Sequence, residues 1–333
     1  MMSGLDEFAL IKRLFLPLAE GEPAALGLMD DVALIDGADG SQWVVTTDAI
    51  VAGVHFLADD PADLIARKLI RVNLSDLAAK GAEPCYLLLA ACFPRDVTDE
   101  WLDRFASGLK SDCAHFKVAL IGGDTVATPG PLTLSLTALG RVARETALLR
   151  SNARSGDEVW VSGSLGDAAL GLLVAKGGAH GLSSDHADYL LDRYRLPRPR
   201  LQLGRHLHGL AHAAMDISDG LLADLSHICE ASGCGAVIEA AALPRSPAAQ
   251  AALAQGLGEG LASLAAGGDD YELLFTAPPA AAQELADLSR QLGLPLTLIG
   301  RITAEKAVKL LGDDGGEIRL GRRGYLHFDG SGG

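Results

Sequence analysis

Several patterns are missing from this sequence of 333 residues, and each absence removes a class of protein. No block of five or more Lys and Arg residues occurs, and 28 basic residues against 43 acidic ones leave a formal net charge of -15. A chain this acidic repels a phosphate backbone, so we expect no nucleic-acid partner. The longest apolar runs, such as residues 86–92, are far shorter than the roughly 20 residues of a membrane-spanning helix, so we expect no membrane association.

Cysteine is also scarce. The sequence has 5 cysteines, an odd number, and it contains no C-x-x-C pair. This pattern fits neither a disulfide framework nor a zinc site, and it predicts reduced thiols instead. The N-terminal sequence MMSGLDEFALIKRLF places its acids before the apolar residues and its bases after them, which is the reverse of a secretion signal. Both features favour a cytoplasmic location.

Two common nucleotide-binding signatures are missing as well. The sequence contains no G-x-x-x-x-G-K-[ST] loop, and no G-x-G-x-x-G leads from a predicted strand into a helix. Binding of a nucleotide would therefore require a different arrangement of residues.

The composition is that of an ordinary globular protein, with 49% hydrophobic and 21% charged residues. The length predicts two domains of roughly 100 to 200 residues each, and both halves mix strand and helix periodicity, which predicts a mixed α+β or α/β fold. The stretch 144–157 is polar and lacks an apolar period, so we place the domain boundary there. The expected parts are an N-terminal domain over 1–147, a C-terminal α/β domain over 148–329 and a flexible tail over 330–333.

Individual elements are predicted on both sides of this boundary. A helix is expected from Pro61 to Gly81, because its apolar residues recur at helical spacing, and another from Thr98, where two acids follow a capping residue. Further helices are expected from about 167, after the sequence AAMDISDG and over 280–292. The predicted strands are 43–47, 118–121, 132–142, 158–162, 271–276 and 296–302.

Aspartate recurs beside the predicted strands. An isolated Asp in such a place is usually a cap or turn residue, but the recurrence argues against that role for the whole set. Converging carboxylates repel one another, and few Lys or Arg residues lie nearby in the sequence, so we expect a divalent cation to compensate them. Hard oxygen ligands suit Mg²⁺. The set comprises Asp30, Asp31, Asp48, Asp76, Asp124, Asp216, Asp219, Asp269 and Asp270.

Magnesium in turn suits a phosphate ligand. We expect residues 122–125 (GGDT) to form a turn whose backbone N–H groups approach an anion. We expect Ser218 and Gly220 to present N–H groups in the same way at a helix N-terminus. The residues thus predict metal-dependent chemistry on a phosphorylated ligand, and by themselves they leave the reaction open.

Seven segments of the sequence, taken in order, resemble the thiamine-monophosphate kinase family of the aminoimidazole ribonucleotide synthetase superfamily. The segments are LMDDVAL, TTDAIVAGVHF, VNLSDLAAKGA, LIGGDT, MDISDGLLADL, GGDDYELLFT and GYLHF, and the resemblance covers about residues 8–328. It implies the two-domain fold of that superfamily and a homodimer whose core is formed by the N-terminal domains. It also implies ATP-dependent phosphorylation of thiamine monophosphate to thiamine diphosphate.

The resemblance further implies roles for individual residues, with several Mg²⁺ ions, ATP as the co-substrate and no general base. The implied nucleotide contacts are Gly123, Asp124, Arg150 and Ser218, and the implied thiamine phosphate contacts are His55, Asp269 and Tyr325. The implied metal ligands are Asp31, Thr46, Thr47, Asp48, Asp76, Asp124, Asp216 and Asp219.

Several of these residues would also suit a purely structural role. His55 fits a core histidine at a domain edge, Arg150 a solvated linker residue, and Tyr325 a residue that packs the last strand. Two residues depart from the family pattern: Met29, where the family usually has glycine, and Asp269, where it often has glutamate.

Three other functions compete with kinase activity. They are another ATP-dependent synthetase of the superfamily, a metal-dependent phosphohydrolase, and a non-catalytic sensor of nucleotide or thiamine diphosphate. A phosphate monoester has a second pKa of about 6, so it is largely ionised at neutral pH and needs no base. For the kinase we therefore predict direct transfer of the γ-phosphoryl group, with positioning and charge neutralisation as the catalytic effects.

Overall fold

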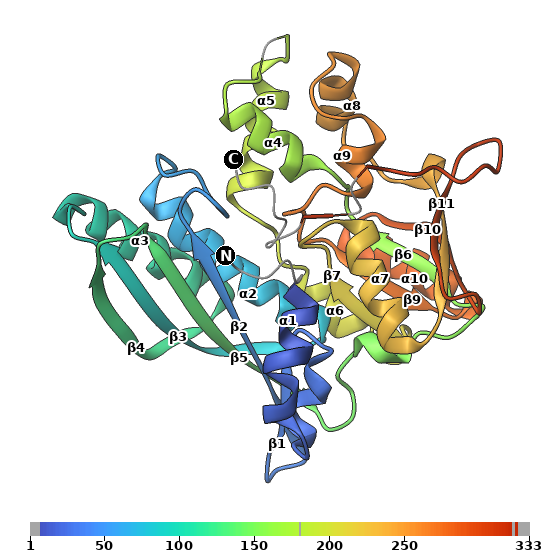
Figure 1. Ribbon diagram of the computed structural model, residues 1–333, viewed down its shortest axis with the longest axis horizontal. Coiled ribbons are helices and arrows are strands. Elements are labelled where there is room, and N and C mark those ends of the chain that lie inside the picture. Colours follow the sequence, from blue (N-terminus) through green and yellow to red (C-terminus); the bar gives the residue numbers. More distant parts are fainter. Residues whose placement is uncertain (1–6, 180, 322–323, 326–333) are drawn as a thin grey trace.

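The structure is a computed structural model that describes residues 7–179, 181–321 and 324–325. Two β-sheets, one in each half of the sequence, form its framework (Figure 1). The predicted tail over 330–333 lies outside the described residues. Within the described ranges, no helix is both long enough and apolar enough to cross a membrane.

The first sheet has five strands in the order β1-β2-β5-β3-β4. Strands β3 and β4 run parallel, and the other neighbours are antiparallel. Gly123 lets β4 approach β3 closely, because a Cβ atom at this position would lie 1.8 Å from the Leu89 carbonyl oxygen. Residues 122–125, predicted as a turn, therefore lie within a strand. The bounds are β1 Ala33–Asp36, β2 Ser41–Val51, β3 Glu83–Pro94, β4 Ala119–Thr128 and β5 Thr133–Ala143.

Two helices, α2 (Ala62–Ala79) and α3 (Asp99–Phe116), cover one face of this sheet. Most residues of α2 are buried, because this helix also contacts the second half of the chain; Figure 1 shows it between the two sheets. Thr98 caps α3 by accepting a hydrogen bond of 3.2 Å from the Trp101 N–H, as the sequence predicts.

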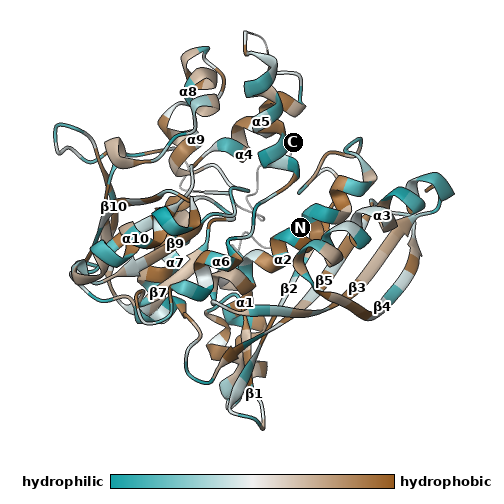
Figure 2. Cartoon of the chain, turned by 180° about the vertical axis from the view of Figure 1, so that it is seen from behind, coloured by the Kyte–Doolittle hydropathy of each residue, from teal (hydrophilic) through white to brown (hydrophobic). Residues whose placement is uncertain are grey.

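The opposite face of the first sheet exposes large apolar side chains. Tyr86, Leu88 and Val126 are 40%, 38% and 45% exposed, and Figure 2 shows apolar residues running along β3 and β4. Monomeric proteins rarely expose an extended apolar face, and such a face usually marks an interaction surface.

The second sheet has six strands in the order β11-β8-β10-β6-β9-β7. Helix α7 packs on one face of it, and α6 and α10 pack on the other. Helices α4, α5 and α8 share a separate small core. The strands are β6 Glu158–Ser162, β7 Ala213–Asp216, β8 Gly235–Glu239, β9 Leu273–Ala277, β10 Leu296–Thr303 and β11 Val308–Leu311. The helices are α4 Asp167–Ala175, α5 Ser184–Arg195, α6 Leu201–His206, α7 Leu221–Ser232, α8 Pro247–Ala254, α9 Leu261–Ala265 and α10 Ala282–Leu292.

Shorter helices complete the described chain. Helix α1 covers Glu7–Leu14. The 3-10 helices are η1 Leu16–Ala19, η2 Pro23–Leu28, η3 Arg150–Asn152, η4 Ala240–Ala242 and η5 Pro279–Ala281.

The mixed architecture and most predicted elements are confirmed. The strand predicted over 271–276 begins instead at Leu273. Asp269 and Tyr271 have φ angles of 69° and 50°, so the chain takes left-handed conformations there and cannot continue as a strand. The predicted linker 144–157 lies between β5 and β6, and the exact boundary between residues 147 and 148 stays a prediction.

Candidate functional site

A cleft of about 830 Å³ lies where the two halves of the chain meet. Its walls include Asp48 and Asp76 from the first half and Asp216, Asp219 and Asp269 from the second. A smaller hollow of about 540 Å³ lies beside residues 12–27 and contains none of the predicted site residues. The larger cleft is therefore the candidate active site.

Three carboxylates meet at the floor of the cleft. Asp31 precedes β1, Asp76 lies on α2 and Asp216 ends β7, and one oxygen from each lies within 4.8 Å of the others. The Thr46 hydroxyl donates a hydrogen bond of 2.6 Å to Asp76. The predicted convergence of these three aspartates is thus present in the folded chain.

The three carboxylates do not share one electrostatic environment. Burial alone would raise the pKa of Asp31, but Arg150 and Lys80 together hold it well below its ordinary value. The Lys80 ammonium lies 2.7 Å from Asp31, and Arg150 forms an ion pair with the same carboxylate. Part of the charge compensation that we expected from a metal ion therefore comes from these two side chains.

Among the described residues, no Lys or Arg forms an ion pair with the other two carboxylates, although Lys80 and Ser75 partly offset the shift in the pKa of Asp216. Burial raises the pKa of Asp76 well above its ordinary value, and Asp48 and Asp216 add to the shift. Burial, together with Asp31, raises the pKa of Asp216 to about 7. Both groups therefore hold a proton or a cation more readily than an ordinary aspartate. An oxygen donor set with this unmet negative charge fits a hard divalent cation such as Mg²⁺.

The neighbouring β2 residues divide between the two faces of the sheet. Thr46 and Asp48 lie on the face covered by α2, and the Asp48 N–H donates a hydrogen bond of 3.1 Å to the Asn73 side chain. The Thr47 side chain lies on the other face, where it is exposed and accepts a hydrogen bond of 3.1 Å from Thr137. Because strand side chains alternate, the hydroxyls of Thr46 and Thr47 lie on opposite faces of the sheet, although Thr47 also lines the cleft.

The turn between β7 and α7 is occupied by a side chain that the sequence analysis missed. One oxygen of the buried Asp224 accepts hydrogen bonds from the N–H groups of Ser218, Asp219 and Gly220, at 3.1, 3.2 and 3.1 Å. The N–H groups that we expected to bind an external anion are thus already paired within the chain. Burial and then Asp219 raise the pKa of Asp224 well above its ordinary value.

A second group of possible metal-binding side chains lies at the same turn. Asp219, Asp224 and His227 each offer one ligand atom, and these atoms lie within 4.8 Å of one another. Burial, and then Arg150, lowers the pKa of His227 to about 4. Asp219 also accepts a hydrogen bond of 2.9 Å from the Tyr325 N–H through its backbone oxygen, which holds Tyr325 at the rim of the cleft.

The residues expected to hold the thiamine phosphate lie on another wall of the cleft. Asp269 and Tyr271 pair with the turn between β7 and α7, since their N–H groups donate hydrogen bonds of 2.8 Å to the carbonyl oxygens of Ser218 and Ile217. His55 lies nearby and accepts a hydrogen bond of 3.1 Å from the Val51 N–H at Nδ1. The structure therefore brings most of the predicted metal ligands and all three predicted acceptor contacts to one cleft.

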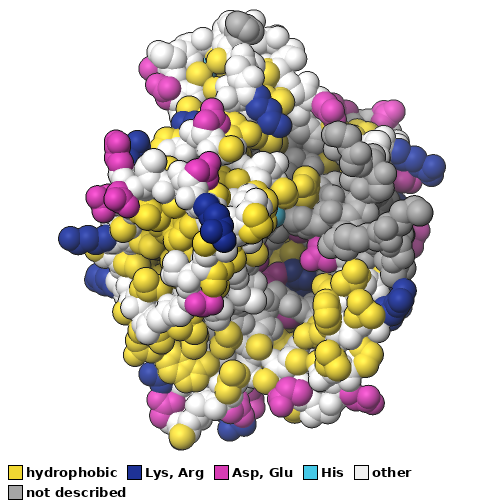
Figure 3. Space-filling view, turned by 60° about the vertical axis from the view of Figure 1, so that its left-hand side comes forward, with side chains coloured by type: hydrophobic (Ala, Val, Ile, Leu, Met, Phe, Trp, Pro, Cys, Tyr) yellow, Lys and Arg dark blue, Asp and Glu magenta, His cyan; other side chains and the backbone are white. Residues whose placement is uncertain are grey.

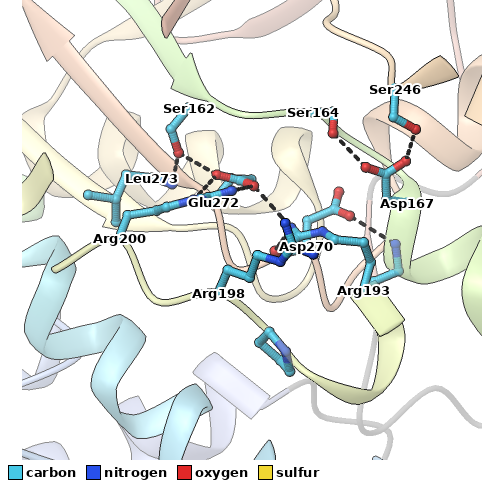
Figure 4. A network of polar contacts seen from close by, with 12 residues as sticks. Ser162, Ser164, Asp167, Arg193, Arg198, Arg200, Ser246, Asp270, Glu272 and Leu273 are labelled. Carbon is cyan, nitrogen blue, oxygen red and sulfur yellow. Dashed lines mark hydrogen bonds and ion pairs between the residues drawn. The ribbon is translucent and has the colours of Figure 1, made fainter. Parts of the chain in front are cut away.

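Asp269 and Tyr271 line the cleft, whereas the alternate residues Asp270 and Glu272 do not and instead anchor the segment through polar contacts (Figure 4). Asp270 accepts hydrogen bonds of 2.6 and 3.2 Å from the N–H groups of Gly166 and Ala168 at the start of α4. Glu272 is buried and accepts hydrogen bonds from Ser162 (2.6 Å), Arg193 (3.0 Å) and the Arg200 Nε (2.6 Å). The left-handed segment 269–271 is thus fixed from behind by buried polar contacts.

Asp124 does not join the carboxylate cluster of its own chain. It lies on the exposed edge strand β4, in register with Ala90, Ser135 and Ala49, three strands away from β2. Three strand spacings amount to about 14 Å. Its side chain also lies on the outer face of the sheet, like that of Thr47. Gly123 and Asp124 therefore cannot reach the cleft floor of the same chain.

The remaining expectations have clear outcomes in the structure. Tyr325 is 48% exposed, and β11, the last described strand, ends before it, so it does not pack a strand there. Arg150 is not a solvated linker residue, because its side chain is only 12% exposed and forms an ion pair with Asp31. Met29 has a negative φ angle of -110°, so this position does not require glycine in this chain.

Comparison with known proteins identifies the family. Residues 29–142 match the model of the AIR synthase related protein N-terminal domain, and residues 154–313 match that of the C-terminal domain. A thiamine-monophosphate kinase from Caulobacter vibrioides is 44% identical over 323 residues, which cover 96% of this chain and 90% of that protein. The chain belongs to the thiamine-monophosphate kinase family. The resemblance seen in its motifs is thereby confirmed.

Solved structures agree with this family and with the predicted fold. A thiamine-monophosphate kinase from Stenotrophomonas maltophilia K279a is 42% identical, with a TM-score of 0.76 over 94% of this chain and 98% of that one. The structure of AaThiL complexed with AMPPCP and TMP is 30% identical, with a TM-score of 0.85 over 97% of each chain.

Proposed function

We propose that this protein transfers the γ-phosphoryl group of ATP to thiamine monophosphate and so forms thiamine diphosphate and ADP. The observation that carries the proposal is the single cleft that joins the carboxylates Asp76 and Asp216 to the acceptor-side residues His55, Asp269 and Tyr325. Membership of the thiamine-monophosphate kinase family supports it, as does the likeness to AaThiL, whose structure holds AMPPCP and TMP together.

The reaction requires no proton transfer from the acceptor. A phosphate oxygen of thiamine monophosphate forms a bond to the γ-phosphorus of ATP while the bond to the β–γ bridging oxygen breaks. The electron pair of that bond stays with ADP. Because the attacking phosphate has a second pKa of about 6, it is already ionised, and no side chain needs to act as a general base.

The principal difficulty is that two anions must meet inside an acidic cleft. We propose that Asp31, Asp76 and Asp216, with Asp48 and Thr46, hold Mg²⁺ there. When bound, the metal supplies positive charge that offsets the repulsion between phosphates. Lys80 and Arg150 keep Asp31 ionised and fixed in position for that purpose. Asp219 extends the metal site toward the turn before α7.

The nucleotide contacts follow from the same geometry. Arg150 lies within the cleft and presents the edge of its guanidinium group beside Asp31. Ser218 also lines the cleft, and because its N–H is bonded to Asp224, we assign its nucleotide contact to the hydroxyl group. We assign the thiamine phosphate to the wall formed by His55, Asp269 and Tyr325.

We further propose that the active protein is a homodimer formed through the outer face of the first sheet. Figure 3, which brings this side of the molecule forward, shows hydrophobic side chains gathered on it. Asp124 and Thr47 lie on this face, and Thr47 also lines the cleft of its own chain, whereas Asp124 does not. A second copy packed on the face would bring its Gly123 and Asp124 toward Thr47 of the first. A cytoplasmic location stays a prediction.

An isotope-transfer experiment tests the proposed reaction. The protein is incubated with ATP carrying radioactive γ-phosphate, thiamine monophosphate and Mg²⁺, and the products are separated. We expect the label in thiamine diphosphate. Label released only as inorganic phosphate would instead indicate a phosphohydrolase, and binding of both ligands without loss of ATP would indicate a sensor. Formation of a product only with a different acceptor would indicate another synthetase of the superfamily.

A further inference from the structure

Lys68 is a buried cation that no part of the proposed reaction uses. It lies on α2, and its side chain is 3% exposed. An ammonium group is costly to bury unless its charge and its donors are satisfied. The groups around Lys68 must therefore offset the cost of burying its ammonium group.

Three groups from separate parts of the chain surround the ammonium. Its Nζ donates a hydrogen bond of 2.8 Å to the carbonyl oxygen of His55 and one of 2.9 Å to the Asp269 carboxylate. It also lies 4.4 Å from the centre of the Tyr194 ring, a geometry suited to a cation–π contact. The first partner belongs to the N-terminal half and the other two to the C-terminal half.

Both hydrogen-bond partners, His55 and Asp269, are residues of the proposed acceptor site. Asp269 has a left-handed backbone, with a φ angle of 69°, which a residue other than glycine retains only where its surroundings enforce it. The ion pair with Lys68 is one such contact and the only one of those described that acts on the Asp269 side chain across the two halves. Together with the hydrogen bond to the His55 carbonyl, it links the His55 wall to the Asp269 wall.

We propose that Lys68 is a positioning residue that aligns the two walls of the acceptor site and neutralises Asp269. This inference rests on the proposed function. It changes how the acceptor is recognised, because an aspartate already paired with a lysine attracts the thiazolium cation only weakly. Recognition of that cation then depends chiefly on the Tyr325 ring. The phosphate of the acceptor, in turn, meets less negative charge than an unpaired Asp269 would impose.

The test compares Lys68→Met, Lys68→Arg and the exposed control Lys110→Met. The affinity for thiamine monophosphate is measured by titration calorimetry, and the KM values for thiamine monophosphate and ATP are measured separately. Loss of a charge-assisted hydrogen bond predicts a roughly 10- to 100-fold weaker affinity for thiamine monophosphate in Lys68→Met. The KM for ATP should stay within about twofold, and Lys68→Arg should recover part of the affinity. The control should match the unchanged protein.

A double-mutant cycle with Asp269→Asn separates positioning from general stability. If the two residues act as a pair, Lys68→Met combined with Asp269→Asn should cost less than the product of the two single effects. Independent effects, or equal losses for both substrates together with a lower melting temperature, would overturn the inference. If Lys68→Met does not fold, the same comparison is made with Lys68→Arg.

The calorimetric measurement also keeps the inference distinct from the proposed function. Binding of thiamine monophosphate without phosphoryl transfer would contradict the kinase reaction and leave Lys68 under test. Unaltered affinity in Lys68→Met, in a protein that does transfer phosphate, would contradict the role of Lys68 alone. Absence of binding by the unchanged protein would contradict both.

Discussion

The Thr46 hydroxyl donates a hydrogen bond of 2.6 Å to Asp76 and so joins β2 to α2 at the floor of the cleft. Asp76 gains this one donor while it faces three other carboxylates, and its pKa stays well above the ordinary value because burial and then Asp48 and Asp216 oppose its ionisation. The carboxylates thus favour binding of a cation, and their mutual repulsion lowers the stability of the metal-free protein.

Neutralising one of these carboxylates should change activity and stability in opposite directions. Asp76→Asn and Asp216→Asn should each lower kcat by about 100-fold or more, because each removes a proposed metal ligand. The same changes should raise the melting temperature of the metal-free protein by roughly 2 to 5 °C, because one member of a repelling group is neutralised. Thermal melts with and without Mg²⁺ check both effects. The exposed control Asp103→Asn should alter neither, and a lower metal-free melting temperature in both variants would contradict the assignment.

Tyr325 offers a test of acceptor recognition. An aromatic ring beside a permanent cation is worth about 0.5 to 2 kcal/mol, so Tyr325→Ala should raise the KM for thiamine monophosphate by roughly 2- to 30-fold. The KM for ATP should hardly change, and Tyr325→Phe should retain most of the affinity because it keeps the ring. The backbone hydrogen bond from residue 325 to Asp219 persists in both variants. Equal effects on the two substrates would show that Tyr325 only maintains the local fold.

Asp270 predicts a dependence of stability on pH. Burial, and then Asp167, raises the pKa of Asp270 to about 8 in the folded protein, whereas an unfolded chain has the ordinary value near 4. Between these values the folded protein keeps a proton that the unfolded chain has lost, so stability falls as the pH rises through this window. Asp270→Asn cannot ionise and removes this contribution.

The melting temperature should therefore fall less between about pH 6 and about pH 9 in Asp270→Asn than in the unchanged protein. The exposed Asp313→Asn is the matched control, and its slope should equal that of the unchanged protein. The absolute melting temperature of Asp270→Asn is not the criterion, because an amide satisfies the N–H groups of Gly166 and Ala168 less well than a carboxyl group does. Parallel slopes in all three proteins would exclude a raised pKa at Asp270.

The proposed homodimer predicts complementation between two inactive variants. If Asp124 serves the cleft of a second copy, Asp124→Asn and Asp76→Asn should each be inactive alone. A mixed dimer would contain one intact site. Random exchange of subunits makes half of the dimers mixed, so about a quarter of the full activity should return. Mixed dimers that form but stay inactive would contradict the placement of Asp124 in the partner's site.

The sequence predicted what depends on local pattern. A short apolar run gave the centre of β2, alternation of apolar residues gave β5, and helical spacing with an initial proline gave α2. The same alternation, applied more strictly, would also have separated Thr46 from Thr47, because neighbouring strand residues point to opposite faces. The order of the motifs indicated the family, and the resemblance predicted many of the residues that line the cleft.

Long-range partners were beyond local pattern. Arg150 and Asp31 are 119 residues apart, and no periodicity links them, so their ion pair becomes visible only in the folded chain. Asp224 was missed because an acid is common in the first turn of a helix. Its favourable interaction with the helix dipole already explains its presence. The position of Asp124 depends on the order of strands in the sheet, which the predicted elements did not specify.

The most direct test of the account is a coupled assay of ADP release with thiamine monophosphate and Mg²⁺ each supplied or withheld. The proposed reaction predicts rapid ADP formation only when ATP, thiamine monophosphate and Mg²⁺ are all present, because the acceptor attacks the γ-phosphate and the carboxylate cluster is proposed to hold the metal. ADP formation at the same rate without thiamine monophosphate, or without any divalent cation, would contradict it.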